Sequence, residues 1–284
     1  MSIKIAVIAN CQASPLYFLL PYMSSDIEVV KIPPVHTIAK KDVRIVLDAV
    51  NEVDYVIHQP IGADFGPISV ENIKIAAPRK QYISFPSIYF SGLLPHLSYL
   101  RSPNTGSIQS PLGDYHDIRI LRAFLDGKSI DQCIATVDDF PFDGSHFFQS
   151  CLAESRRREV GLDVRVMDRV EEQIQTSQTF YTFNHVDNQL MWYVAEKTLE
   201  IISAKRDKAV RPPVTKLLGT VIAGVPERLC EEQRLEWRNP QYSLLGTPLD
   251  LRQLASESYA IYQSIADLRM LIEFNRHRFA PGII

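Results

Sequence analysis

A largely apolar run at the start of the chain constrains the fold more than any other feature. Residues 3–9 are rich in Ile, Val and Ala, and the run ends at the polar Asn10. Such a run indicates a strand buried on both faces of a parallel sheet. Residues 12–23 follow with a helical pattern in which Pro15 lies in the first turn, where proline is tolerated. A strand followed directly by a helix favours an α/β fold.

Strand and helix patterns continue to alternate over the first part of the chain. Short apolar runs predict further strands, and amphipathic spacing predicts the helices between them. Later in the chain the pattern becomes mostly helical. The expected strands are 27–32, 54–58 and 80–85, and the expected helices are 38–51, 69–76, 114–126, 129–136, 145–176, 186–205 and 250–276.

This order of elements predicts the fold class, which is α/β. We expect an N-terminal open parallel sheet with flanking helices, followed by a mostly helical C-terminal half. The sheet part is expected at residues 1–110 and the helical part at 111–284, packed together as one globular unit. Residues 87–115 have the character of an irregular functional loop, and residues 206–249 that of a connecting arm.

Composition and charge exclude several classes of protein. A content of 46% hydrophobic and 22% charged residues indicates a globular protein rather than a disordered or fibrous one. The formal net charge of −3 gives no reason to expect nucleic-acid binding. The four cysteines form no CxxC pair, which predicts a reducing, cytoplasmic location. No run approaches the ~18 apolar residues of a membrane span, and no histidine pair has the spacing of a helical metal site.

Polar side chains follow three of the predicted strands at the points where these strands end. Asn10-Cys11-Gln12 follows the first strand, His58-Gln59 closes the third, and Phe85-Pro86-Ser87 follows the fourth. In open parallel sheets, ligands bind beyond the carboxyl ends of the strands. The sequence therefore predicts one site at this edge of the sheet.

Cys11 is the candidate for chemistry at this edge. A cysteine between a buried strand and a helix lies near backbone N–H groups and the positive helix end, which favour a thiolate and stabilise an oxyanion. The side-chain amide of Gln12 adds a donor for developing negative charge. The alternative is that Cys11 is a small buried residue with no chemical role.

Two histidines are candidates for a general base. His185 comes just before a predicted helix for which Asp187 or Asn188 is a suitable cap. His116 lies in Tyr115-His116-Asp117 at the start of another predicted helix. Each histidine has a structural alternative, and the choice between them stays open. His58 and His96 are weaker candidates.

Several motifs in a fixed order resemble those of a known family. They are Ala9-Asn10-Cys11-Gln12-Ala13, His58-Gln59-Pro60, the stretch 85–95, Asp114-Tyr115-His116-Asp117 and Phe183-Asn184-His185. In this order they resemble the WcbI-type polysaccharide biosynthesis proteins, a family linked to acetyl transfer in capsule synthesis. The resemblance implies binding of coenzyme A (acetyl-CoA) and transfer of its acetyl group to a sugar hydroxyl of a surface polysaccharide precursor.

On this interpretation the chain is an O-acetyltransferase with coenzyme A at the predicted sheet edge. Asn10, Gln59 and Ser87 are expected to contact the cofactor, with Arg79 and Arg101 near its phosphates. Neither a P-loop nor a GxGxxG motif is present to bind a nucleotide in the usual way. Cys11 is either a nucleophile or a binding residue.

Two other functions remain open at this point. An esterase of the SGNH type also has its nucleophile after the first strand, but it uses serine there, and Ser14 lies one turn into the helix. The second alternative is a non-catalytic component of a polysaccharide assembly complex that binds coenzyme A or sugar. The amphipathic C-terminal helix could serve for docking or as the interface of a homodimer.

Overall fold

The structure of the chain is a computed structural model that describes residues 2–139 and 143–283. The chain divides into two compact units, and each unit is made of three separate segments. The first unit comprises Met1–Tyr89, Ser155–Glu172 and His185–Leu218, and the second comprises Phe90–Glu154, Gln173–Asn184 and Gly219–Ile284. The division thus differs from a single boundary near residue 110, because two later segments return to the first unit.

The first unit is built on a four-stranded parallel sheet in the order β2-β1-β3-β4. Ile8 pairs with His58, and His58 pairs with Ser84, so these strands end together at the carboxyl edge. The expected open parallel sheet is confirmed, with the apolar first strand in an interior position. Its strands are β1 (Ile3–Ile8), β2 (Ile27–Val30), β3 (Tyr55–His58) and β4 (Gln81–Ser84).

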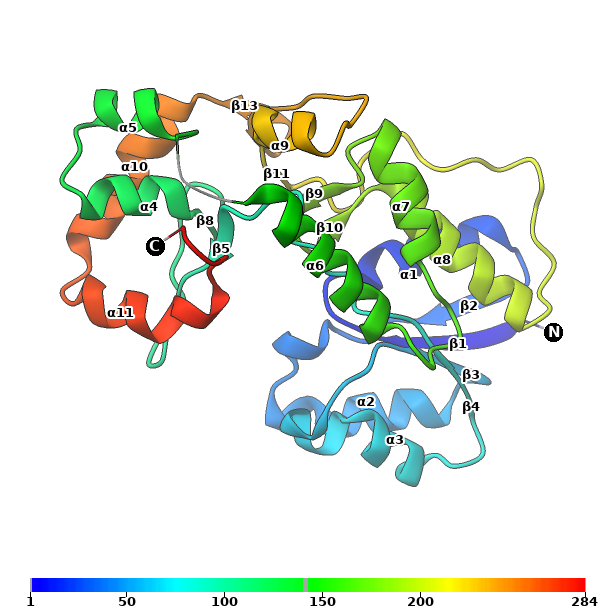
Figure 1. The fold of residues 1–284 in the computed structure, drawn as a ribbon. Helices are drawn as coiled ribbons and strands as arrows, with labels where there is room; N and C mark the ends of the chain where they lie inside the picture. The colour runs from blue at the N-terminus through cyan, green and yellow to red at the C-terminus, as the bar shows by residue number, and fades with distance from the viewer. Residues whose placement is uncertain (1, 140–142, 284) are drawn as a thin grey trace. The chain divides into compact units, whose positions relative to one another are not determined.

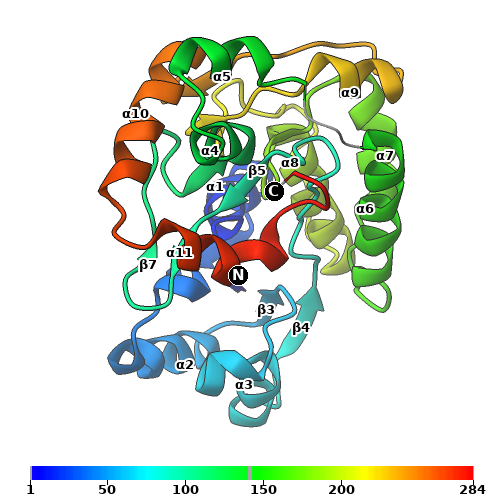
Figure 2. The same cartoon turned by 60° about the vertical axis from the view of Figure 1, so that its left-hand side comes forward.

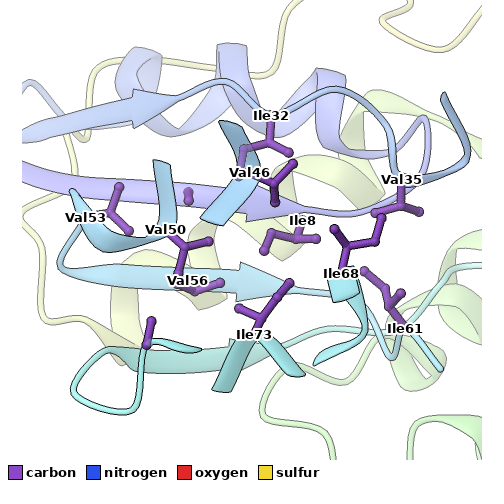
Figure 3. Packing of buried hydrophobic residues seen from close by; sticks show 12 residues of the cluster. Ile8, Ile32, Val35, Val46, Val50, Val53, Val56, Ile61, Ile68 and Ile73 are labelled. Atoms are coloured by element: carbon purple, nitrogen blue, oxygen red, sulfur yellow. The ribbon is translucent and has the colours of Figure 1, made fainter. Parts of the chain in front are cut away.

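Helices cover both faces of this sheet. Successive strand residues point to opposite faces, and Ala6 and Ile8 of β1 face the side of α2 (Val43–Asn51) and α3 (Val70–Ala76). On the other face, α1 (Ala13–Met23) and α8 (Asn188–Ile201) lie against each other (Figure 1). Figure 3 shows the apolar cluster on the first face, which contains Ile8, Ile32, Val35, Val46, Val50, Val53, Val56, Ile61, Ile68 and Ile73.

The second unit combines helices with small antiparallel sheets. Among its helices, α10 lies beside α4 and α5 (Figure 2). One sheet pairs β5 with β8, and another has the order β11-β12-β13. The bounds are α4 (Ile118–Leu125), α5 (Ile130–Thr136), α9 (Glu227–Glu232), α10 (Leu251–Ser264), α11 (Leu268–Asn275), β5 (Leu97–Tyr99), β8 (Tyr115–Asp117), β11 (Val221–Ile222), β12 (Tyr242–Leu244) and β13 (Thr247–Leu249).

The helix expected over residues 145–176 is two helices, α6 (Gly144–Arg158) and α7 (Met167–Thr176). Gly161 has a φ of +82°, a left-handed conformation that a helix interior does not contain. The Glu159 carboxylate accepts hydrogen bonds from the backbone N–H groups of Val166 and Met167, at 2.8 and 3.1 Å. These bonds supply partners for the N–H groups that begin α7, so the second helix starts there.

Segments expected to be irregular also contain short strands. Residues 87–115 include the hairpin of β6 (Arg101–Ser102) and β7 (Gly106–Ser107) as well as β5. Within 206–249, Leu245 and Gly246 both have positive φ and join β12 to β13. Two-residue hairpin turns of this kind usually carry Asn or Gly at the first position. Because Leu245 occupies that position, the sequence did not indicate a hairpin here. The remaining short elements are β9 (Phe180–Thr182), β10 (His185–Val186) and the 3₁₀ turns Val35–Thr37, Lys40–Asp42, Ala63–Ile68 and Arg276–Arg278.

Within the described part of the chain, no helix has both the length and the apolar character needed to cross a bilayer.

The packing of α3 generates a test of the core on this face of the sheet. Ile73 is 1% exposed and belongs to the apolar cluster, whereas Ile75 on the same helix is 71% exposed. Replacing Ile73→Val removes a buried methylene and is expected to lower the free energy of unfolding by about 0.5–1.5 kcal/mol. The measurement is urea unfolding, with Ile75→Val as the matched control. The free energy of unfolding of the control should change by no more than about 0.5 kcal/mol. Equal losses in both variants would contradict this packing.

Candidate functional site

Cys11 lies in the turn that joins β1 to α1. The backbone N–H of Ala13 donates to the carbonyl of Asn10 at 3.0 Å, and that of Ser14 donates to the carbonyl of Cys11 at 3.2 Å. The strand ends at Ile8 and, after four intervening residues, the helix begins at Ala13, because Ala13 and Pro15 suit a first helical turn. Asn10 and Cys11 are half-buried.

Asn10 connects Cys11 to the ends of the neighbouring strands. Its backbone N–H donates to Gln59 Oε1 at 3.0 Å, and its Nδ2 donates to Ser87 Oγ at 3.2 Å. Its Oδ1 accepts from the backbone N–H of Gln12 at 2.9 Å and from Cys11 Sγ at 3.9 Å. The structure thus brings together Asn10, Cys11, Gln12, Gln59 and Ser87, as the strand ends predict.

Gln12 has a structural position rather than the one predicted for it. Its side chain is 0% exposed, its Nε2 donates to the carbonyl of Ile88 at 2.7 Å, and its Oε1 accepts from Gln59 Nε2 at 2.7 Å and from the backbone N–H of Ile88 at 3.1 Å. An amide engaged in this way is directed at the protein and not at a substrate. The prediction that the Gln12 amide donates to an oxyanion is therefore corrected, and Gln12 fixes the turn instead.

The thiol of Cys11 is less acidic than its helix-start position predicts. Burial raises its pKa to about 11, and the backbone N–H groups of Cys11 and Gln12 lower it by a smaller amount. Removing water from a thiolate disfavours the charged form more than these N–H groups and the helix end favour it. Cys11 is therefore a neutral thiol near pH 7, in contrast to the expected thiolate.

His185 lies in β10 in the first unit, directly before α8, where the carboxylate of Asp187 caps the helix by accepting from the N–H of Leu190 at 2.9 Å. Burial lowers the pKa of His185 to about 4, against a smaller opposing effect of a hydrogen bond with the backbone at Leu218. The imidazole is neutral over most of the physiological range and can accept a proton. The expected cap at Asp187 is confirmed.

His116 does not fit the role of general base. It is 1% exposed in the second unit, with Nδ1 at 3.1 Å from the Tyr262 hydroxyl and Nε2 at 3.0 Å from the carbonyl of Ile108. Both ring nitrogens are engaged, and burial lowers its pKa. This prediction is corrected, because the ring serves to hold the second unit together.

Of the two arginines expected near phosphates, one lies at the opposite edge of the sheet and the other belongs to the second unit. Arg79 precedes β4 and is exposed at the amino edge of the sheet, the edge opposite to Cys11. It was predicted at the site from its charge, but parallel strands place their beginnings and ends at opposite edges. Arg101 belongs to the second unit, where its guanidinium lies 5.1 Å over the ring of Tyr99 and its backbone N–H donates to Asn275 Oδ1 at 2.9 Å.

Another cation, Arg158, contacts Tyr89, which lies two residues after the site residue Ser87. Arg158 lies with its guanidinium 5.3 Å over the ring of Tyr89, and it donates to the carbonyl of Tyr89 at 2.6 Å and to Ser155 Oγ at 3.0 Å. Tyr89 is 38% exposed and follows Ile88, the residue that Gln12 binds. The triplet Arg156-Arg157-Arg158 had the pattern of a solvated helix face, and Arg156 does form exposed pairs with Asp168 and Glu171. Sequence spacing does not show that Arg158 contacts Tyr89 while its neighbour Arg156 forms surface ion pairs.

In the part of the chain that the structure describes, no group of three or more His, Cys, Asp or Glu side chains is placed to hold a metal ion. His58 is buried, with Nδ1 at 3.0 Å from the carbonyl of Gln59, and its pKa is lowered by burial. His96 is fully buried in the second unit, and burial lowers its pKa to about 3.

Fold and site together define a mixed α/β protein with a cysteine in a strand-to-helix turn at the carboxyl edge of a parallel sheet. The model of a family described as "Polysaccharide biosynthesis enzyme WcbI" matches residues 4–207, more than half of the chain. The chain therefore belongs to the WcbI family of polysaccharide biosynthesis enzymes, as the order of its motifs predicts.

A solved structure has the same fold. It is that of WcbI, described as a novel polysaccharide biosynthesis enzyme, and it is 16% identical with a TM-score of 0.71 over 96% of this chain and 99% of that chain. That structure is described as the native protein without a disulfide bond between coenzyme A and a cysteine of that protein. A comparison with curated proteins finds no match.

The buried amide of Gln12 generates a stability prediction. Replacing Gln12→Ala leaves the Ile88 carbonyl, the Ile88 N–H and the Gln59 amide without this partner in a buried place. At about 1–3 kcal/mol for a buried unsatisfied group, we expect the free energy of unfolding to fall by about 2–4 kcal/mol. Gln253→Ala on the exposed surface of α10 is the control, with a change within about 0.5 kcal/mol in urea unfolding. A Gln12→Ala variant as stable as the control would contradict the network.

The raised pKa of Cys11 generates a reactivity prediction. Alkylation proceeds through the thiolate, so the rate at Cys11 should rise about tenfold for each pH unit from pH 7 toward a pKa of about 11. The measurement is the rate of iodoacetamide labelling of the Cys11 peptide by mass spectrometry, with free glutathione in the same tube as the control for intrinsic reactivity. A rate that levels off below pH 8 would show an activated thiolate instead.

Proposed function

We propose that the protein transfers an acyl group, acetyl in the simplest case, from coenzyme A to a sugar hydroxyl in polysaccharide biosynthesis. The observation that carries the proposal is the fixed position of Cys11, which Asn10, Gln59 and Ser87 hold at the carboxyl edge of the sheet. Membership of the WcbI family supports the pathway. The description of the similar structure, which mentions coenzyme A and a cysteine, supports the donor.

The side chains near this edge fit coenzyme A. Coenzyme A supplies an activated acyl group as a thioester and carries phosphates that need a cation. Asn10, Cys11 and Ser87 are placed to contact the sulfur end, and all three are exposed or half-buried. Arg158 provides a guanidinium for a phosphate, and Tyr89 offers an exposed aromatic ring. In this proposal Arg158 is the cation that binds a phosphate of coenzyme A.

Cys11 acts in this proposal as a binding residue. With a pKa of about 11, the thiolate fraction at pH 7 is ~10⁻⁴, so an attack by Cys11 would begin from a scarcely populated form. The sugar oxygen attacks the thioester carbonyl carbon directly, the new C–O bond forms, and the C–S bond breaks. The N-terminal end of α1 beside Cys11 favours the negative charge that develops on the carbonyl oxygen.

His185 acts as the general base. Its pKa of about 4 keeps the imidazole neutral at pH 7. An imidazole of this pKa is a weak base, so it takes the proton of the sugar hydroxyl only as the C–O bond forms and the hydroxyl becomes more acidic. The imidazolium then returns this proton to the leaving sulfur, and the histidine ends the cycle in its starting state. The sign of the shift means that His185 does not become charged as the pH falls from 8 to 5.5.

Binding of coenzyme A tests the donor part of the proposal. We expect coenzyme A to raise the melting temperature. At a concentration 100 times its dissociation constant, it should raise the free energy of unfolding by about 2.7 kcal/mol. Arg158→Ala should weaken binding about 10-fold to 100-fold, since a charge-assisted hydrogen bond contributes about 1.5–3 kcal/mol. Arg156→Ala, in the same triplet but paired on the surface, is the matched control and should bind normally. No thermal shift with coenzyme A would reject the proposed donor.

Transfer by Cys11 variants tests the chemical step. If the sugar attacks directly, Cys11→Ala and Cys11→Ser should retain acetyl transfer to within about tenfold, because neither variant removes the base or the donor site. The assay is release of free coenzyme A thiol in the presence of an acceptor sugar. A loss of transfer in both variants, together with an acetylated Cys11 peptide in the unmodified protein, would establish a covalent route.

A further inference from the structure

Two adjoining cavities lie in the second unit, and none of their lining residues has been assigned a role above. The larger has a volume of about 380 Å³ and the smaller about 180 Å³, and both are lined by Asp138, Pro226 and Glu227. The larger falls within the range of about 300–1,000 Å³ that small-molecule sites occupy. Pro226 and Glu227, at the start of α9, therefore lie between two neighbouring compartments.

A buried ion pair forms the rigid wall of the larger cavity. Arg119 lines the cavity and donates through Nη2 to Asp117 Oδ2 at 2.7 Å and to the Tyr242 hydroxyl at 2.9 Å. The Tyr242 hydroxyl in turn donates to Asp117 Oδ2 at 2.6 Å. Asp117 and Arg119 are almost completely buried, and such pairs add little net stability because both charges lose their water. The network instead holds the Arg119 and Tyr242 side chains in fixed positions.

The charge of the lining excludes anionic ligands. Arg119 pairs with two carboxylates, those of Asp117 and Asp138. The carboxylates of Glu227 and Asp250 also line the larger cavity, so its net charge is negative. In the smaller cavity, Arg228 is already paired with Glu232 at 2.8 Å. A phosphate or a uronic acid would meet net negative charge here. Hydroxyl groups, which donate to carboxylates, would be favoured.

The lining also has apolar surface beside its polar groups. The carboxylate of Glu227 has no hydrogen bond or ion pair with any residue in the described part of the chain, so it is available to a ligand. Gln241 adds an exposed amide at the same cavity. Pyranose rings present hydroxyls at their edges and C–H groups on their faces, which matches a mixture of carboxylate, amide and apolar side chains. The apolar lining residues are Val137, Val225, Pro226, Leu249 and Leu251.

We propose that these neighbouring cavities bind a neutral oligosaccharide, with one sugar unit in each compartment and Glu227 between them. The proposal deepens the function proposed above and rests on it, because it names the acceptor as a chain of at least two uncharged sugar units. It also separates the acceptor site from the coenzyme A site by charge, since the donor's phosphates are excluded from the acidic cavities.

Saccharide binding by the full-length protein tests this inference without any chemical step. The probes are immobilised di-, tri- and tetrasaccharides of glucose, galactose and N-acetylglucosamine, with polygalacturonate fragments and inorganic phosphate as anionic probes. We expect binding of at least one neutral oligosaccharide, more tightly than its monosaccharide by tenfold or more, and none of the anionic probes. Absence of binding to every neutral oligosaccharide, or preference for an anionic probe, would overturn the proposal.

Matched variants on α9 locate the site. Glu227→Ala should weaken the binding of the selected oligosaccharide about tenfold, whereas Glu231→Ala, an exposed residue of the same helix that does not line the cavities, should leave it unchanged. Equal affinities in the two variants would overturn the assignment. The dissociation constant for coenzyme A, measured in parallel, separates the two hypotheses. If coenzyme A binds normally and Glu227→Ala does not change oligosaccharide binding, only the saccharide site is rejected. If the unmodified protein does not bind coenzyme A, the proposed donor is rejected.

Discussion

A buried amide has to find hydrogen-bond partners, and in this protein that requirement fixes the geometry around Cys11. Gln12 is completely enclosed, and its side chain satisfies both backbone groups of Ile88 and the amide of Gln59. Three chain segments that are far apart in sequence are thereby joined at one edge of the sheet. The position of Cys11 is set before any ligand arrives, which lowers the cost of ordering the site on binding.

The same enclosure decides the chemistry available to Cys11. A thiol beside a helix start gains from the nearby N–H groups, but burial has the larger effect and raises its pKa to about 11. His185 is affected in the complementary direction, because burial removes its positive form and leaves a neutral imidazole. Burial thus produces a neutral thiol and a neutral imidazole in one unit. This combination suits a reaction in which the attacking group comes from the substrate.

Much of the first unit could be predicted from the sequence, because periodicity and strand ends are local signals. The apolar run before Asn10 locates β1, and parallel strands bring Gln59 and Ser87 to the same edge. These local signals do not determine the direction in which an individual side chain points. Nothing local distinguishes a Gln12 amide that binds Ile88 from one that faces a ligand.

Tertiary contacts between distant segments account for the other differences. Arg158 lies over Tyr89 while Arg156 pairs with Asp168, although the two arginines are neighbours in a charged triplet. His116 looked suitable as a base from its place at a helix start, but Tyr262, which bonds its ring, comes from the far end of the chain. Contacts across such separations depend on the complete fold and leave no mark on local spacing.

The interleaved segments of the two units have a consequence for synthesis of the chain. The apolar side of α1 packs against α8, whose last residue is Ile201, so the first unit lacks a covering helix while the intervening residues are being made. At about 5–20 residues per second, this interval lasts on the order of ten seconds. During that time Tyr22 of α1 lacks the ring of Trp192 of α8, which lies 6.4 Å from its own ring in the finished protein. One side of α1 therefore stays uncovered until the chain is nearly three-quarters complete.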